Sequence, residues 1–127
     1  MRKKILVVED HAPIVKLIKA ALEGQGHGVI TAANGAEGLL RVNDSHPDIV
    51  ILDLMMPIMD GHQMLRVIRE NAATEKLPVV VLTAKSSDVD VVKGLRAGIS
   101  YYLTKPFSVD ELLAIVNRVL ADTAPGA

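Results

Sequence analysis

The sequence predicts an α/β fold in which one parallel β-sheet is covered by helices on both faces, the doubly wound arrangement. Short apolar runs alternate along the chain with segments of helical periodicity. The first, third and fourth runs are almost purely aliphatic, as strands are when both of their faces are covered. The 127 residues contain no internal repeat or linker, and the composition does not change along the chain, which indicates a single domain.

The apolar runs themselves are the five predicted strands. The last run is shorter and more mixed than the others, which is typical of a strand at the edge of a sheet. Each run is followed by a helical segment, so the chain is a series of five β-then-α units. The runs are Ile5–Val8, Val29–Ala32, Ile49–Leu52, Val79–Leu82 and Tyr101–Leu103.

The first helix is predicted from an apolar stripe. Ile14, Ile18 and Leu22 fall four residues apart and therefore share one face. Gly24 and Gly26 follow and are expected to end the helix. The residues predicted to flank the stripe are Leu17 and Ala21.

The remaining helices follow from the same periodicity and from one capping signal. The last helix opens with a capping box, Ser108 with Glu111 three residues later. We expect one domain over residues 1–122 and a disordered tail over residues 123–127. The other helices are predicted over residues 36–43, 62–70 and 88–96. The inward residues are Met64, Leu65 and Ile68 in the third helix and Leu112, Ile115, Val116 and Val119 in the last.

Composition and charge exclude several classes of function. The formal net charge is −1, so no bulk electrostatic attraction to nucleic acid or to an anionic membrane is expected. The chain has no cysteine, which excludes disulfides, thiolate metal sites and a cysteine nucleophile. The apolar run near the start is too short for a signal peptide, and no segment approaches the roughly 18 apolar residues of a membrane span. We interpret the chain as cytoplasmic, with no direct contact to nucleic acid or membrane.

Polar side chains follow four of the predicted strands at their carboxyl ends, where open α/β sheets bind ligands. Glu9 and Asp10 follow the first strand, Asp53 the third, Thr83 the fourth and Lys105 the fifth. A buried carboxylate is costly unless it is paired, so an aspartate at the end of an aliphatic strand indicates a site.

The residue types in this group favour a cation and a phosphoryl group. Three neighbouring carboxylates repel one another, and a divalent cation relieves that repulsion. All the candidate ligands are oxygens, which favours a hard cation such as Mg²⁺. A lysine and a threonine beside such an ion suit a phosphoryl group, and an aspartate can accept that group as an aspartyl-phosphate.

Four motifs, in order and at fixed spacing, resemble the receiver domain of bacterial two-component response regulators, of which the chemotaxis regulator is the single-domain type. They are VVED, DIVILDLMMPIMDG, VVLTA and YLTKPF, with 30 residues from Asp53 to Thr83 and 22 more to Lys105. The resemblance covers Lys3 to about Leu120. It implies a flavodoxin-like (βα)5 fold with a five-stranded parallel sheet in the order 2-1-3-4-5.

The resemblance also implies a role for each residue of the site. Asp53 is the phosphoacceptor. Glu9 and Asp10 hold Mg²⁺, one of them through water, and the backbone carbonyl of Met55 completes the metal ligands together with Asp53. Lys105 pairs with the phosphoryl oxygens or with Asp53.

Further positions are implied to shape the site or to respond to phosphorylation. Thr83 is the switch hydroxyl, and Tyr102 is the switch aromatic that turns inward as Thr83 moves. The Lys105–Pro106 peptide bond is expected to be cis. Pro57 and Gly61 shape the loop after Asp53.

Some residues depart from the commonest family pattern. Glu9 replaces an aspartate, and it should still reach the metal. Tyr101 replaces a smaller or acidic residue, and we expect Tyr101 and Tyr102 to point to opposite faces of their strand. Met55 and Lys85 occupy positions at which the family tunes the lifetime of the phosphoryl group.

The predicted function is that of a phosphorylation-activated receiver in a two-component phosphorelay. A sensor histidine kinase or a phosphotransfer protein supplies the phosphoryl group. The face of the fourth helix, fifth strand and fifth helix then engages a downstream effector. The chain is expected to be a monomer or a phosphorylation-dependent dimer, and to be no enzyme beyond its own phosphorylation and slow dephosphorylation.

Three alternatives stay open at this point. An Mg²⁺-dependent phosphohydrolase with an aspartyl-phosphate would usually have a second aspartate where this chain has Met55. A flavodoxin-like FMN binder would need more aromatic residues than two tyrosines and one phenylalanine. A receiver-like scaffold that is never phosphorylated would not need the full acidic set and Lys105.

Overall fold

The structure is a computed structural model that describes residues 2–56, 58–84 and 99–122. Its core is a five-stranded, entirely parallel sheet in the order β2-β1-β3-β4-β5, which confirms the predicted topology. The central strands β1, β3 and β4 are the three aliphatic runs. The strands are β1 Lys4–Val8, β2 Gly28–Ala32, β3 Ile49–Asp53, β4 Val79–Thr83 and β5 Tyr101–Thr104.

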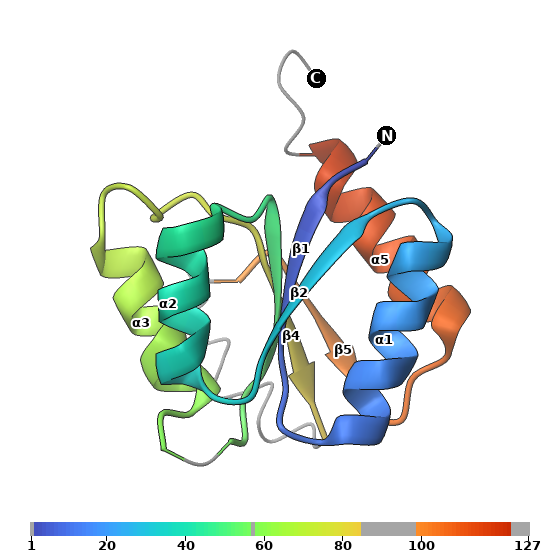
Figure 1. Ribbon diagram of the computed structural model, residues 1–127, viewed down its shortest axis with the longest axis horizontal. Coiled ribbons are helices and arrows are strands. Elements are labelled where there is room, and N and C mark those ends of the chain that lie inside the picture. Colours follow the sequence, from blue (N-terminus) through green and yellow to red (C-terminus); the bar gives the residue numbers. More distant parts are fainter. Residues whose placement is uncertain (1, 57, 85–98, 123–127) are drawn as a thin grey trace.

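Helices cover both faces of the sheet, with α1 and α5 on one side and α2 and α3 on the other (Figure 1). The predicted helix over residues 88–96 and the predicted tail over residues 123–127 lie outside the described residues. The described helices agree with the periodicity of the sequence to within one or two residues at most ends. They are α1 Ala12–Gly24, α2 Gly35–Ser45, α3 Gly61–Glu70 and α5 Val109–Asp122.

Two apolar cores result from the alternation of side chains along each strand. In β3, Ile49 and Ile51 belong to the core under α1 and α5, whereas Val50 and Leu52 belong to the core under α2 and α3. All four side chains are fully buried. An aliphatic residue is therefore favoured at each interior position of a central strand, which is why the sequence shows continuous apolar runs rather than alternation. The predicted inward residues Met64, Leu65, Ile68, Leu112, Val116 and Val119 are buried in these cores.

Side-chain caps fix where α3 and α5 begin. Ser108 and Glu111 form the predicted capping box, with Ser108 Oγ accepting the Glu111 N–H and Glu111 Oε1 accepting the Ser108 N–H, both at 3.1 Å. Asp60 and Gln63 form a second capping box at the start of α3. This second box sets the point at which the chain turns from the loop after β3 into a helix.

One apolar residue departs from its predicted environment. Leu17, expected beside the buried stripe of α1, is 44% exposed. No helix in the described part of the chain is both long enough and apolar enough to cross a membrane.

Candidate functional site

The predicted acidic residues meet at one rim of the sheet, at the carboxyl ends of β1 and β3. Glu9 and Asp10 follow β1, and Asp53 is the last residue of β3. Each of the three offers a carboxylate oxygen that lies within 4.8 Å of the others. Glu9 and Asp53 are buried, at 2% and 5% exposure, whereas Asp10 is exposed at the mouth of the site. Segments 44 residues apart in sequence thus form one cluster, because neighbouring parallel strands end at the same rim.

Lys105 reaches the same cluster from the segment that follows β5. Its Nζ lies 2.8 Å from Glu9 Oε1 and 3.4 Å from Asp53 Oδ2. The resemblance implied that Lys105 pairs with the phosphoryl oxygens or with Asp53; Lys105 does contact Asp53, and its contact to Glu9 is the shorter one. The Lys105 N–H donates to the Thr83 carbonyl at 2.7 Å, and the Lys105–Pro106 peptide bond is cis, as expected.

The charges in this cluster influence one another strongly. Burial raises the pKa of Glu9, and the neighbouring Asp53 carboxylate raises it further, against the lowering effect of Lys105. Burial disfavours the Lys105 cation, but the hydrogen bond to Glu9 and the charge of Asp53 outweigh it and raise the pKa of Lys105. Three carboxylates share this cluster with one lysine, and a further cation would relieve the repulsion between them.

The loop between β3 and α3 is fixed tightly around Asp53. The Met55 N–H donates to Asp53 Oδ1 at 3.1 Å, and the Met55 side chain is 66% exposed. The Gly61 N–H donates to the Leu54 carbonyl at 3.0 Å, and a Cβ at position 61 would lie 2.4 Å from the Asp53 carbonyl oxygen. Only glycine allows α3 to start this close to the phosphoacceptor predicted by the resemblance. The predicted shaping residue Pro57 lies outside the described residues.

The predicted switch residues lie beside the site. Thr83 is 1% exposed at the end of β4, and its neighbour in β5 is Thr104. Tyr101 and Tyr102 were expected on opposite faces of β5, but their rings stack with centroids 5.9 Å apart and planes 25° apart. Tyr102 is 38% exposed. Lys85 lies outside the described residues.

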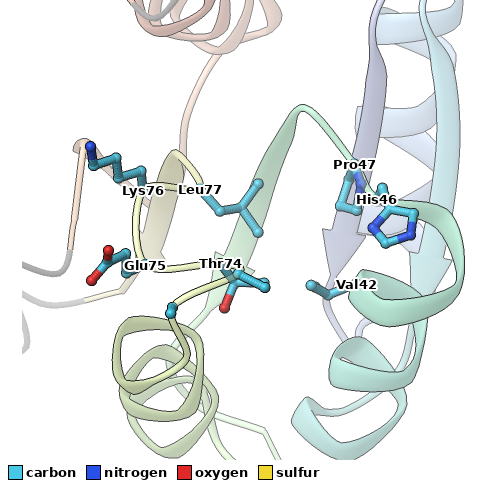
Figure 2. Close-up of a pocket in the computed structure, with 9 residues that line it drawn as sticks. Val42, His46, Pro47, Thr74, Glu75, Lys76 and Leu77 are labelled. Atoms are coloured by element: carbon cyan, nitrogen blue, oxygen red, sulfur yellow. The ribbon is translucent and has the colours of Figure 1, made fainter.

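A sizeable cavity of about 410 Å³ lies at the other end of the sheet (Figure 2). Pro47 precedes β3 and Leu77 precedes β4, so the cavity opens at the amino ends of these strands. The lining contains no cluster of carboxylates. The chemistry that the sequence predicts therefore belongs to the rim with Asp53 and not to this cavity.

Two features of the site were not visible in the sequence. The loop after Asp53 is also held at its far end, where the Gly35 N–H at the start of α2 donates to the Met59 carbonyl at 2.8 Å. Between these fixed points, Ile58 adopts a left-handed backbone conformation with φ of 69°. Neither feature has a local sequence signal, because a contact between α2 and the loop depends on the packing of the whole layer.

The sequence profile described as "Response regulator receiver domain" matches residues 5–117, which is most of the chain. The chain therefore belongs to the response regulator receiver family. Members of this family act in phosphorylation-activated two-component signalling, and the relatives are signalling proteins rather than metabolic enzymes.

Individual relatives agree with this assignment. PhoP of Bacillus subtilis, an alkaline phosphatase synthesis transcriptional regulatory protein, is 42% identical over 120 residues, which are 94% of this chain and 49% of PhoP. PilG of Pseudomonas aeruginosa is 37% identical over 122 residues, which are 96% of this chain and 90% of PilG. The chain spans about half the length of several curated relatives that it matches, PhoP among them.

The fold comparison gives the same result. The receiver domain of a sensor histidine kinase from Pseudomonas aeruginosa, whose crystal structure has a magnesium ion coordinated in the active-site cleft, superposes with a TM-score of 0.86. The two sequences are 30% identical, and the match covers 95% of this chain and 99% of that one.

Proposed function

We propose that Asp53 accepts a phosphoryl group from a phosphohistidine on a partner kinase or phosphotransfer protein, in a reaction that requires Mg²⁺. The observation that carries the proposal is the convergence of three carboxylates within 4.8 Å of one another, with Lys105 in contact with two of them. The phosphorylated chain then presents a changed surface to an effector.

The donor set fits magnesium. Glu9, Asp10 and Asp53 supply carboxylate oxygens, and the backbone carbonyl of Met55 is the further ligand that the family pattern suggests. Burial, together with the neighbouring Asp53 carboxylate, raises the pKa of Glu9, and a cation bound beside these carboxylates would favour their charged forms. When bound, Mg²⁺ would neutralise phosphoryl oxygens and allow a negatively charged donor to approach Asp53.

The chain's own residues position the acceptor. Lys105 holds the Asp53 carboxylate from one side, and the Met55 N–H holds it from the other through Oδ1. Asp53 is buried, which limits the access of water to the acceptor. Burial therefore favours transfer of the phosphoryl group to Asp53 over its hydrolysis by water. Thr83, at the end of the adjacent strand, is the hydroxyl that donates to the phosphoryl group once it is attached, and Tyr102 responds at the edge of the sheet.

We infer that the output surface includes β5 and α5. Tyr101 and Tyr102 expose aromatic surface at this edge, which a partner would cover. PhoP is named as a transcriptional regulatory protein, but this chain spans only half of it. The net charge of −1 favours output through protein contacts over direct contact with nucleic acid, and we propose that the chain acts either as a monomer or as a phosphorylation-dependent dimer.

The test is incubation with acetyl phosphate and Mg²⁺ followed by intact-mass measurement. We expect a gain of one phosphoryl group that is lost on addition of EDTA and in the Asp53→Asn variant. Asp48→Asn is the matched control, because Asp48 is an aspartate at the opposite end of β3 and should leave labelling unchanged. Labelling of Asp53→Asn at the wild-type level would refute the proposal. Sustained turnover of a small phosphate ester would instead favour the phosphohydrolase alternative.

A further inference from the structure

The outer edge of β2 is a row of backbone groups that no described element covers. β2 is the last strand on its side of the described sheet and pairs with β1 alone. In Figure 1, β2 is the foremost strand, with α2 on its left, α1 on its right and no described helix in front of it. An edge strand leaves every second residue with an outward N–H and carbonyl, and these groups can pair with another strand.

The hydrogen bonds to β1 identify the residues whose backbone groups point outward. The first residue of β2, Gly28, donates its N–H to the Lys3 carbonyl at 2.9 Å, and the carbonyl of the last, Ala32, accepts from the residue after β1 at 3.0 Å. In a parallel strand, the N–H and the carbonyl of one residue point to the same side, and successive residues alternate. The even-numbered residues therefore pair with β1, whereas Val29 and Thr31 direct both backbone groups away from the sheet.

The sequence of β2 has none of the usual protections of an edge strand. Natural edges are blunted by lysines, prolines or bulges. The strand reads GVITA, without a charge or a proline, and its register with β1 is continuous over all five residues, without a bulge. Val29, Ile30 and Thr31 are β-branched, a side-chain type that favours strands, and all three are half-buried. This strand is therefore suited to pair with another one.

The backbone of this edge is complementary to itself. When a second copy aligns antiparallel with Ile30 opposite Ile30, Val29 of each copy faces Thr31 of the other, and each such pair exchanges both of its hydrogen bonds. No outward N–H or carbonyl of Val29 or Thr31 is then left unpaired. The copies are related by a two-fold axis perpendicular to the sheet, the symmetry that is commonest among dimers.

Charges on the face of the sheet under α2 favour the same alignment. At the amino end of β2, Arg2 Nη2 lies 3.3 Å from the position that a Cβ on Gly28 would take. That position is on the α2 face, because Gly28 is two residues from Ile30, which packs against the core under α2 and α3. At the carboxyl end, Glu37 Oε2 accepts the Ala33 N–H at 3.2 Å. Antiparallel pairing places Arg2 of each copy near Glu37 of the other.

The opposite face has the reverse arrangement of charge, which is also complementary to itself. Lys16 and Lys19 line one groove with Thr31, near the carboxyl end of β2. Glu23 is exposed in the last turn of α1, directly before the turn into the amino end of β2. Because the two-fold axis sets this face beside the same face of the copy, the lysines of one chain approach Glu23 of the other. Such complementarity fixes register and disfavours other alignments.

We propose that the β2 edge is a homodimerisation surface, at which two copies of this chain pair antiparallel through residues 28–32 and join their sheets. The proposal does not depend on phosphorylation of Asp53, and β5 lies at the opposite edge of the described sheet, so the proposed output surface stays free. The dimer is therefore distinct from a phosphorylation-dependent one. A single strand pair is a small interface, so we expect a weak dimer with a Kd on the order of 100 µM.

The first test uses the wild type alone. Sedimentation equilibrium measures the Kd, and NMR spectra of the same protein are recorded over a dilution series. The amide signals of Val29 and Thr31 should shift with concentration and follow the association curve, because these amides gain hydrogen bonds in the dimer. The amides of β5, from Tyr101 to Thr104, serve as the control and should not shift.

The second test removes the outward donor of Thr31. Thr31→Pro has no N–H at this position but keeps the pairing with β1, since proline is tolerated where the N–H of an edge strand faces outward. Loss of the hydrogen bond from each copy should raise the Kd by roughly tenfold or more. Thr31→Val is the matched control, because it keeps the N–H and the β-branched shape, and its Kd should stay within about twofold of wild type.

The third test reverses charges and does not depend on how well proline is tolerated. Arg2→Glu places like charges together in the antiparallel dimer and should raise the Kd by roughly fivefold. The double variant Arg2→Glu/Glu37→Arg restores opposite charges and should return the Kd to within about twofold of wild type. A purely structural effect of the single substitution would not be reversed by a second change at the other end of β2.

Several results would overturn the inference. A wild type that stays monomeric up to about 1 mM would show that the edge does not self-associate. A dimer whose concentration-dependent shifts fall on β5, or whose Kd is unchanged by a folded Thr31→Pro, would use another surface. Absence of rescue in the double variant would exclude the antiparallel alignment. Association of the wild type only after phosphorylation, or its loss in Asp53→Asn, would contradict the independence from the proposed function.

Discussion

Replacing Gly61 with alanine tests how closely the fold supports Asp53. A Cβ at position 61 would lie 2.4 Å from the Asp53 carbonyl oxygen and 2.7 Å from Leu54 Cα. Both neighbours are backbone atoms of β3 and the loop after it, so no flexible side chain can move out of the way. Ordinary contacts are near 3.5 Å, and the backbone must therefore shift by about 1 Å.

We expect Gly61→Ala to lower the free energy of unfolding by about 2–3 kcal/mol, the upper part of the range for overpacking, because backbone and not a side-chain end must yield. The same shift moves the Asp53 carboxylate relative to Lys105 and the metal ligands. Displacements of about 1 Å can cost on the order of a hundredfold in rate, so labelling by acetyl phosphate should slow by roughly 10- to 100-fold.

The assay combines urea denaturation with the rate of labelling by acetyl phosphate and Mg²⁺. Gly24→Ala is the matched control, because a Cβ there meets nothing within 4 Å and the residue ends α1. That control should gain about 0.5–1 kcal/mol and keep the wild-type labelling rate. The reasoning fails if Gly61→Ala matches wild type in both stability and labelling rate.

Two further predictions concern charge. Lys105→Met should lower the urea midpoint in EDTA, because Glu9 and Asp53 lose the cation between them. Addition of Mg²⁺ should then raise the urea midpoint of the variant by more than it raises that of the wild type. An equal effect of Mg²⁺ on the two proteins would contradict this prediction. Burial lowers the pKa of His27, whose Nδ1 accepts the Lys3 N–H at 3.1 Å. Protonation therefore favours the unfolded chain, and stability that is full above the unfolded pKa of about 6.5 should fall as the pH drops below it. His27→Gln, which keeps an acceptor, should flatten that part of the curve of urea midpoint against pH, and an unchanged slope would show that another group is responsible.

The sequence alone was enough to predict the sheet and most of the site. The central strands are buried on both faces, so all their positions except those at the strand ends are apolar, and the pattern is strong even without context. The rim residues could be predicted for a related reason: parallel strands end at one edge, so any polar residue that follows a strand must lie there. That rule predicts that Glu9 and Asp53 lie close together, although the sequence gives no distance between them.

Only the tertiary structure decided how these residues pair and how the loops are strained. Lys105 and Glu9 are 96 residues apart, and the preference of Lys105 Nζ for Glu9 over Asp53 depends on differences of less than 1 Å between segments. The left-handed conformation of Ile58 lies in a loop whose ends are bonded to α2 and α3, and the stacking of Tyr101 on Tyr102 has no counterpart in the alternation expected along a strand. Periodicity and spacing in the sequence indicate which face of an element or which rim of the sheet a residue occupies. Side-chain partners and backbone strain are decided only when separate segments pack together.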